Sequence, residues 1–302
     1  MTAHKLAGDA YVQTFSQIEV RVDPDYGILW LYQKPTPRPC FNPTLISEVR
    51  SVQIMLETYD GKLPYQGRLV PIHYHVLDSR SPGIFSMGGD LDLFRDHVLR
   101  RDKDGLLKYA KSCIDTIHGF ITGFRLPITT ISLVRGDALG GGFEVAMSSH
   151  VVIAEEHVEM GFPEILFNIF PGMGGYHLLC RRLPVLQVEK LMLSGRKYGA
   201  PELANMGVVD RLAATGQGEQ AVYDFIEENR RHRNGYMALK HVLQKVQQIS
   251  YEELMEVCAY WVDVTMRTTE KDLRLMNRLV RAQDRRTGTE LAELAELEEQ
   301  IA

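Results

Sequence analysis

A run of three glycines separates an apolar strand from a helix near the middle of the chain. Residues 128–135 have the length and composition of a buried strand, and a helix is predicted at residues 143–149, soon after Gly140, Gly141 and Gly142. Because glycine has no Cβ atom, the chain can turn sharply here and bring its backbone N–H groups close to another molecule. The succession of strand, turn and helix predicts an α/β fold with parallel strand pairing.

The same kinds of element are predicted before and after this turn. Runs of apolar and β-branched residues predict four further strands, at residues 15–22, 27–33, 68–76 and 150–154. A helical spacing of apolar residues predicts two long helices, at residues 44–59 and 106–124.

The last third of the chain has a different pattern. From Gly218 onward it is almost entirely helical, with breaks expected at Asn234-Gly235 and at Ser250. We therefore expect a core with the active site at residues 1–212, followed by a helical region at residues 213–302. This helical region is expected to take part in oligomerisation and to cover the pocket.

Charge is unevenly distributed within the helical region. Residues 267–286 are rich in Arg and Lys, whereas the end of the chain is acidic and carries a narrow apolar stripe. The acidic residues are Glu290, Glu293, Glu296, Glu298 and Glu299, and the stripe consists of Leu291, Leu294 and Leu297. The stripe predicts that this segment packs on the core or on a neighbouring subunit.

Composition argues against several classes of protein. The net charge of −5 over 302 residues gives no general attraction to nucleic acid. The N-terminal residues lack the apolar core of a signal sequence, and no apolar run reaches the length of a membrane span. The cysteines lie far apart and form no CxxC pair, so reduced thiols are expected at Cys40, Cys113, Cys180 and Cys258. A cytoplasmic protein is therefore predicted.

Two glycine-containing turns offer backbone donors for an oxygen anion. A strand that ends in glycines and opens a helix leaves unpaired N–H groups, and the helix dipole adds partial positive charge there. Such donors stabilise an enolate or a tetrahedral oxyanion. The predicted donors are Gly141 in the central turn and the amide of Met87, which precedes Gly88 and Gly89 in the other turn. Tight packing alone would also explain glycines at these places.

Two glutamates accompany the turns. Glu144 lies one turn into the predicted helix, and Glu164 follows Pro163 in a context that opens a helix. As a pair they would supply a general base and a general acid for chemistry beside a thioester carbonyl. The alternative for each residue is an ordinary carboxylate that is stabilised by a helix N-terminus.

Other candidates are less specific. A further tight turn at residues 171–175 contains Gly172, for which packing and substrate contact both remain open. His118, His157 and His177 show no partner pattern that would make them bases. The sequence contains no HxxxH pattern, no GxGxxG and no P-loop, so neither a metal nor a nucleotide cofactor is predicted.

Taken together, the motifs resemble those of the enoyl-CoA hydratase/isomerase (crotonase) superfamily. The similarity extends over residues 15–212, and the matching segments are residues 85–90, 139–144, 161–164, 171–175, 193–196 and 204–210. The resemblance implies a crotonase-like spiral of ββα units with a helical C-terminal region. It also implies assembly as a trimer or a dimer of trimers. The implied site residues are the catalytic Glu144 and Glu164, the oxyanion-hole amides of Met87 and Gly141, and the substrate-binding Gly88, Gly89, Gly140 and Gly172.

Within the superfamily, the chain is most similar to the diffusible signal factor synthases. The similarity lies in residues 38–42 and 65–92 and in the long helical C-terminus. This implies a bifunctional dehydratase and thioesterase that converts 3-hydroxyacyl-acyl carrier protein to a free cis-2-unsaturated fatty acid, a quorum-sensing signal. A sensor protein is an implied partner. The alternatives are a conventional enoyl-CoA hydratase or acyl-CoA hydrolase of the same superfamily, and a non-catalytic module that binds a sensor.

Two surfaces would serve such a substrate. Residues 95–111 contain six Lys or Arg and three Asp, which would suit an acidic carrier protein, although an ordinary solvated helix face has the same composition. An apolar tunnel is needed for the acyl chain. Its candidate residues are Leu91, Leu93, Phe94 and Trp261. Packing in the hydrophobic core would explain apolar side chains at these positions equally well.

Overall fold

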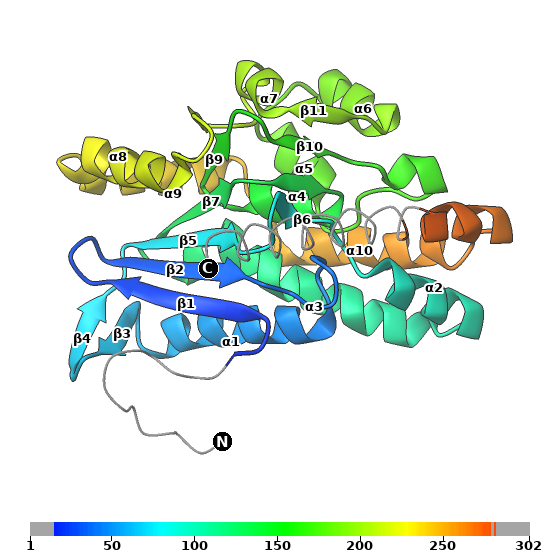
Figure 1. The fold of residues 1–302 in the computed structure, drawn as a ribbon, viewed down its shortest axis with the longest axis horizontal. Coiled ribbons are helices and arrows are strands. Elements are labelled where there is room, and N and C mark those ends of the chain that lie inside the picture. The colour runs from blue at the N-terminus through cyan, green and yellow to red at the C-terminus, as the bar shows by residue number, and fades with distance from the viewer. Residues whose placement is uncertain (1–14, 279–280, 282–302) are drawn as a thin grey trace, which may run out of the picture.

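The computed structural model describes residues 15–278 and residue 281, and its largest element is a six-stranded sheet (Figure 1). The strand order is β1 (Ile18–Asp23), β2 (Ile28–Gln33), β5 (Tyr74–Ser79), β7 (Thr129–Val134), β9 (Val151–Glu155) and β12 (Arg211–Ala213). Only the pair β1 and β2 is antiparallel, and every other neighbouring pair in this sheet is parallel. The predicted α/β fold with parallel pairing is confirmed.

A four-stranded sheet carries the turns of interest. Its order is β11 (Lys197–Gly199), β10 (Glu159–Gly161), β8 (Asp137–Leu139) and β6 (Ile84–Ser86). The pairs β5 and β6, β7 and β8, and β9 and β10 each place their first strand in the large sheet and their second strand in the small one. Because β6, β8 and β10 are parallel neighbours, the turns that follow them meet at one edge of the small sheet.

Helices follow these strand pairs in regular succession. They are α2 (Leu91–Arg100) and α3 (Lys103–Ile121) after β6, α4 (Gly141–Ser148) after β8, and η2 (Glu164–Phe167) and α5 (Gly175–Cys180) after β10. After α5 the chain forms α6 (Val185–Ser194) and α7 (Ala200–Met206) on either side of β11. The repeated strand, strand and helix order agrees with the expected ββα units.

Both faces of the large sheet are buried. Along β2, Leu29 and Leu31 enter one apolar cluster while Trp30 and Tyr32 enter the other, as the two-residue period of a strand requires. The first cluster lies under α1 (Pro43–Thr58) and α3, and the second lies under α8 (Gly218–Arg230). Figure 1 shows α1 and α3 on the opposite side of the sheet from α8.

The C-terminal helices include α8, α9 (Arg233–Val246) and α10 (Tyr251–Thr265), and residues 270–278 are also helical. Ser250 and Glu253 form a capping box at the start of α10, so the expected break at Ser250 is confirmed. The expected break at Asn234-Gly235 is wrong, because α9 runs through both residues. The turn between α8 and α9 lies instead at Arg231 and His232, directly before α9 begins. Gly235 is tolerated within α9 although glycine costs a helix about 1 kcal/mol relative to alanine.

Two further predictions need correction. The strand expected at residues 68–76 is two strands, because β4 (Arg68–Pro71) turns back to pair with β3 (Lys62–Tyr65) before β5 begins at Tyr74. The helix expected at residues 106–124 begins earlier, at Lys103, and ends at Ile121, because Gly123 and Phe124 both adopt a positive φ.

The structure also shows the state of the cysteines and the apolar character of the helices. All four cysteines are free thiols. No helix within residues 15–278 is long and apolar enough to cross a bilayer. The acidic residues 290–299, the leucine stripe and the end of the basic segment lie outside the described residues.

Candidate active site

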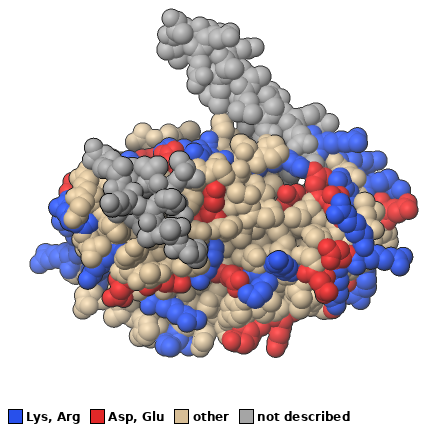
Figure 2. All heavy atoms as spheres, turned by 90° about the horizontal axis from the view of Figure 1, so that it is seen from below, with Lys and Arg blue, Asp and Glu red and all other residues tan. Residues whose placement is uncertain are grey.

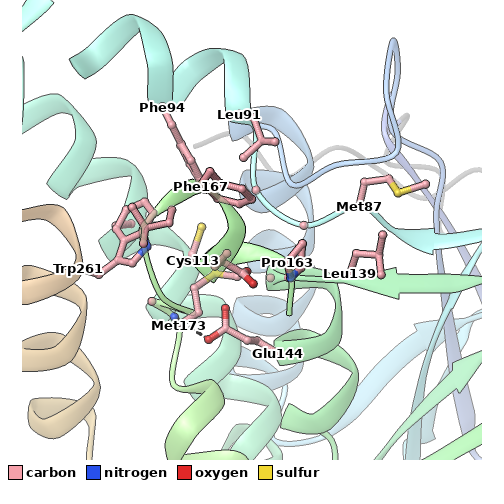
Figure 3. Close-up of a pocket in the computed structure, with 18 of the residues that line it drawn as sticks. Met87, Leu91, Phe94, Cys113, Leu139, Glu144, Pro163, Phe167, Met173 and Trp261 are labelled. Carbon is pink, nitrogen blue, oxygen red and sulfur yellow. Dashed lines mark hydrogen bonds between the residues drawn. The ribbon is translucent and has the colours of Figure 1, made fainter. Parts of the chain in front are cut away.

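The turns after β6, β8 and β10 enclose a largely apolar cavity of about 220 Å³. Figure 3 shows Trp261, Phe94 and Phe167 toward one end of this cavity and Met87 and Leu139 toward the other. We call this space the main cavity. An apolar cleft with a few convergent polar groups is the usual form of a small-molecule site.

Both predicted glutamates line the main cavity. Glu144 lies in the first turn of α4 and is 1% exposed, and Glu164 begins η2 and is 8% exposed. The Oε1 atom of Glu144 accepts hydrogen bonds from the N–H groups of Met173, at 2.8 Å, and Gly175, at 2.7 Å. The Oε2 atom of Glu164 has no hydrogen-bond partner among the described residues. Two carboxyl groups of unequal environment therefore face one apolar space.

Burial changes the proton affinity of both glutamates. It raises the pKa of Glu144 to about 7, although the N–H groups of Gly175 and Met173 partly oppose this by stabilising the carboxylate. Burial also raises the pKa of Glu164 well above its ordinary value, and the nearby charge of Glu144 raises it further. Near neutral pH the pair therefore holds at least one proton, so that an acid and a base can be present together.

The backbone donors differ from those expected. The N–H of Gly141 and the N–H of Gly89 both lie at the cavity and have no acceptor among the described residues. By contrast, the N–H of Met87 donates to the carbonyl oxygen of Pro39 at 2.8 Å, and the N–H of Gly88 donates to Ser86 Oγ at 3.1 Å. The prediction that Met87 supplies a free donor is therefore wrong for this structure.

The second turn nevertheless lies beside Gly141, as expected. A Cβ atom built on Gly88, whose φ is +91°, would stand 2.8 Å from the carbonyl oxygen of Leu139 and 3.0 Å from the nitrogen of Gly141. A Cβ atom built on Gly141 would stand 3.4 Å from the nitrogen of Gly89. Only glycine permits the two turns to approach so closely. The unpaired amides of Gly89 and Gly141 are thus neighbours.

The other predicted glycines also line the cavity. Gly140 has a φ of +55°, and a Cβ atom there would lie 2.5 Å from Glu164 Oε1. A Cβ atom on Gly172 would lie 2.3 Å from Cγ of Trp261. Gly172 therefore allows close packing of the turn against α10, whether or not it also touches a substrate.

Three of the four predicted tunnel residues line the main cavity, namely Leu91, Phe94 and Trp261. The rings of Phe94 and Trp261 meet edge to face at 5.1 Å, which closes this end of the cavity with residues from α2 and α10. Leu93 is not among the lining residues and instead borders a groove between α1, α2 and α3. Within the described residues, none of the three candidate histidines lines the main cavity.

Residues that the sequence did not reveal complete the site. Tyr109 and Cys113 of α3 line it, and burial raises the pKa of both side chains well above ordinary values, so neither is a ready nucleophile. Met173 projects over Gly141, with its methyl carbon 2.3 Å from the position that a Cβ atom on Gly141 would take. The apolar spacing of α3 indicated burial for Cys113 but gave no signal for Tyr109, and it did not show which side chains face a cavity.

Part of the charge in residues 95–111 is already neutralised. Arg95 pairs with Asp92 and Asp96, Lys103 with Asp263, and Lys111 with Asp115. The exposed Arg100, Arg101 and Lys108 have no ion-pair partner among the described residues. Figure 2 shows many Lys and Arg side chains gathered at the right-hand end of the molecule, where Figure 1 places α2.

Comparison with known proteins agrees with this architecture. A family model described as enoyl-CoA hydratase/isomerase matches residues 72–279, which is more than half of the chain. The chain therefore belongs to the enoyl-CoA hydratase/isomerase family.

Two curated relatives share 30% sequence identity with the chain. They are the enoyl-CoA isomerase/hydratase claC of Penicillium crustosum, over 176 residues, and the probable mitochondrial enoyl-CoA hydratase 2 of Arabidopsis thaliana, over 165 residues. The matches cover 58% and 55% of this chain but only 18% and 52% of the two relatives. The chain thus spans about half, or less, of the length of these proteins.

Solved structures share the fold at low sequence identity. Enoyl-CoA hydratase from Bacillus halodurans superposes with a TM-score of 0.71 at 18% identity, covering 86% of this chain and 100% of that one. Pseudomonas aeruginosa DspI superposes with a TM-score of 0.67 at 19% identity, covering 82% of this chain and 93% of that one. Human mitochondrial delta3-delta2-enoyl-CoA isomerase superposes with a TM-score of 0.67 at 16% identity, covering 93% of this chain and 99% of that one. The expected crotonase fold is confirmed.

Proposed function

We propose that the protein is a bifunctional dehydratase and thioesterase. It converts a 3-hydroxyacyl chain on acyl carrier protein to a free cis-2-unsaturated fatty acid that serves as a quorum-sensing signal. The observation that carries the proposal is the pair of buried carboxyl groups, Glu144 and Glu164, in one apolar cavity beside two unpaired amides. The resemblance of the motifs to diffusible signal factor synthases supplies the substrate class.

Dehydration uses the two carboxyl groups in their two protonation states. The ionised carboxylate takes a proton from Cα, the electrons of that C–H bond form the Cα=Cβ bond, and the C–O bond at Cβ breaks. The departing hydroxyl receives the proton of the other carboxyl group and leaves as water. The N–H groups of Gly89 and Gly141 stabilise the negative charge that develops on the thioester oxygen.

Hydrolysis uses the same groups on the unsaturated product. A carboxylate removes a proton from water as the water oxygen bonds to the thioester carbon, and the amides of Gly89 and Gly141 stabilise the tetrahedral oxyanion. The C–S bond then breaks, and the carrier thiolate leaves and takes up a proton. Loss of one oxyanion donor typically lowers turnover by about 10²- to 10³-fold.

The partners belong to the same proposal. An acidic carrier protein docks at the end of the molecule that carries Arg100, Arg101 and Lys108, whose charges are unpaired among the described residues. Residues 1–212 hold the active site, and the region from residue 213 covers the pocket through Trp261 and takes part in a trimer or a dimer of trimers. The protein is cytoplasmic and also binds a sensor protein through the C-terminal helices.

Mass spectrometry of the products tests the proposal. Incubation with 3-hydroxydodecanoyl-acyl carrier protein is expected to release free cis-2-dodecenoic acid. The variants Glu144→Gln and Glu164→Gln should each lower this release by at least about 10²-fold. Glu189→Gln, at an exposed position on α6, is the matched control and should behave as the wild type.

A second candidate is a conventional enoyl-CoA hydratase or acyl-CoA hydrolase. It is favoured by the names of the curated relatives, which include a probable enoyl-CoA hydratase. Reversible hydration of trans-2-enoyl-CoA with no release of free acid would establish this candidate and overturn the first. If both glutamine variants keep full biological activity, the protein is instead a non-catalytic module that binds a sensor.

A further inference from the structure

A second, smaller cavity lies behind the main one. It measures about 20 Å³, its surface is entirely apolar, and it lies between α1, α3, α4 and β5. Cys113 and Met173 line both cavities, so these two side chains form the wall between them. We call this smaller space the inner cavity. Its volume is enough for about one methyl-sized group, so it is more than an ordinary packing gap.

The wall between the cavities contains a side chain that can move. The backbone of Met173 is held by its N–H, which donates to Glu144 Oε1 at 2.8 Å. Its thioether side chain is only half-buried and has three rotatable bonds, which makes methionine the most adaptable of the large apolar residues. The side chain can therefore turn while the backbone beside Glu144 stays in place.

Met173 also stands where an acyl chain would pass. Its methyl carbon covers Gly141, whose free amide faces the main cavity, and its backbone contacts Glu144. A chain whose reacting carbons lie at Glu144 and Glu164 meets the Met173 side chain as it extends away from them. Figure 3 shows Met173 and Cys113 side by side in this part of the site.

We propose that the inner cavity receives the terminal methyl group of a long acyl chain, with Met173 turning aside to admit it. This inference rests on the proposed function for the nature of the substrate. Ile46 and Val49 of α1, Ile117 of α3 and Val145 of α4 then set the longest chain that the protein accepts. Each methylene that enters such a site adds about fourfold to the affinity, from about 0.8 kcal/mol of apolar burial.

The test fills the inner cavity without touching the main one. In the double variant Val49→Ile and Val145→Ile, one carbon is added to each of two lining residues. Val52→Ile, at a buried position of α1 that lines neither cavity, is the control for added volume. Calorimetric titration measures the affinity of all three proteins for octanoic, decanoic, dodecanoic and tetradecanoic acids, which requires no turnover.

The double variant should bind octanoic acid as the wild type does but lose about fourfold in affinity for every acid long enough to place its terminal methyl group in the inner cavity. The loss should therefore appear only with the longer acids, while Val52→Ile follows the wild type at every length. Equal profiles for all three proteins would overturn the inference, even if cis-2-enoic acid is produced. A shifted profile without any such product would leave the inner cavity in place and overturn the proposed function instead.

Discussion

The hydroxyl group of Tyr109 donates a hydrogen bond of 2.6 Å to the carbonyl oxygen of Phe41. The same hydroxyl lies 3.4 Å from the N–H of Asp90, and the N–H of Phe41 donates to the carbonyl oxygen of Gly88 at 2.8 Å. Tyr109 thus ties α3 to the segment before α1 and to the turn that carries the free amide of Gly89. The position of that amide depends on contacts made by a helix that begins well after it in the chain.

Removal of this hydroxyl should loosen the turn. In Tyr109→Phe the carbonyl of Phe41 loses a buried donor, so we expect a loss of about 1–3 kcal/mol in the free energy of unfolding. We also expect kcat to fall by about 10- to 100-fold with a smaller change in KM, because the displaced amide acts mainly in the transition state. Denaturant titration and steady-state kinetics measure the two effects. Tyr260→Phe, at a 59% exposed position, should change neither.

Activity should depend on the ionisation of both glutamates. Burial raises the pKa of Glu144 to about 7 and that of Glu164 well above its ordinary value. The active form needs one carboxylate and one acid, so kcat/KM should rise as the pH increases through about 7 and fall when the second proton is lost. A pH profile of kcat/KM measures this. A rate that stays constant between about pH 5 and about pH 9 would exclude the pair as acid and base.

The sequence predicted the longer strands and helices of the fold because their signals are local. The apolar segment of β7 and the helix after the three glycines each carry their own periodicity, whereas the three-residue strand β8 between β7 and the glycines was too short to be recognised. The strand expected at residues 68–76 was wrong for the complementary reason. A local pattern does not show that β4 folds back on β3, because that pairing depends on a turn whose geometry the apolar pattern does not encode.

The paired carboxyl groups of the site were predictable from the sequence, but the backbone N–H groups that are free to donate hydrogen bonds were predictable only in part. Glu144 and Glu164 were identified from their motif contexts, and both line the main cavity. Met87 was expected to offer a free amide, but its N–H pairs with Pro39, a residue far away in sequence. Hydrogen bonds between such distant segments leave no periodic signal, so sequence alone does not distinguish an occupied amide from a free one.

The buried glutamates should also make stability depend on pH. Because the pKa of Glu164 is raised in the folded state, the folded protein binds more protons than the unfolded protein once the pH exceeds the ordinary glutamate pKa. The free energy of unfolding should therefore fall as the pH rises from about 4.5 to the raised pKa, by up to about 1.4 kcal/mol for each pH unit in that interval. In Glu164→Gln this decline should be smaller. Chemical denaturation at several pH values measures it, and an equally steep decline in the variant would contradict the assignment.

The contact between Gly141 and Met173 predicts that one substitution lowers activity and that a second substitution restores part of it. In Gly141→Ala the new methyl group would stand 2.3 Å from the Met173 methyl carbon, so the Met173 side chain must move across the main cavity. We expect kcat/KM to fall by about 10²-fold, in the range for a misplaced reacting group.

Shortening the opposing side chain should relieve this clash. The double variant Gly141→Ala with Met173→Ala should recover part of the activity relative to Gly141→Ala, because residues in contact give non-additive effects. Gly235→Ala, where a Cβ atom meets nothing within 4 Å, is the control and should leave activity unchanged while stabilising α9 by up to about 1 kcal/mol. Steady-state kinetics of the wild type, the single variants Gly141→Ala and Met173→Ala and the double variant completes the cycle, and strictly additive losses would show that the Met173 side chain does not transmit the effect.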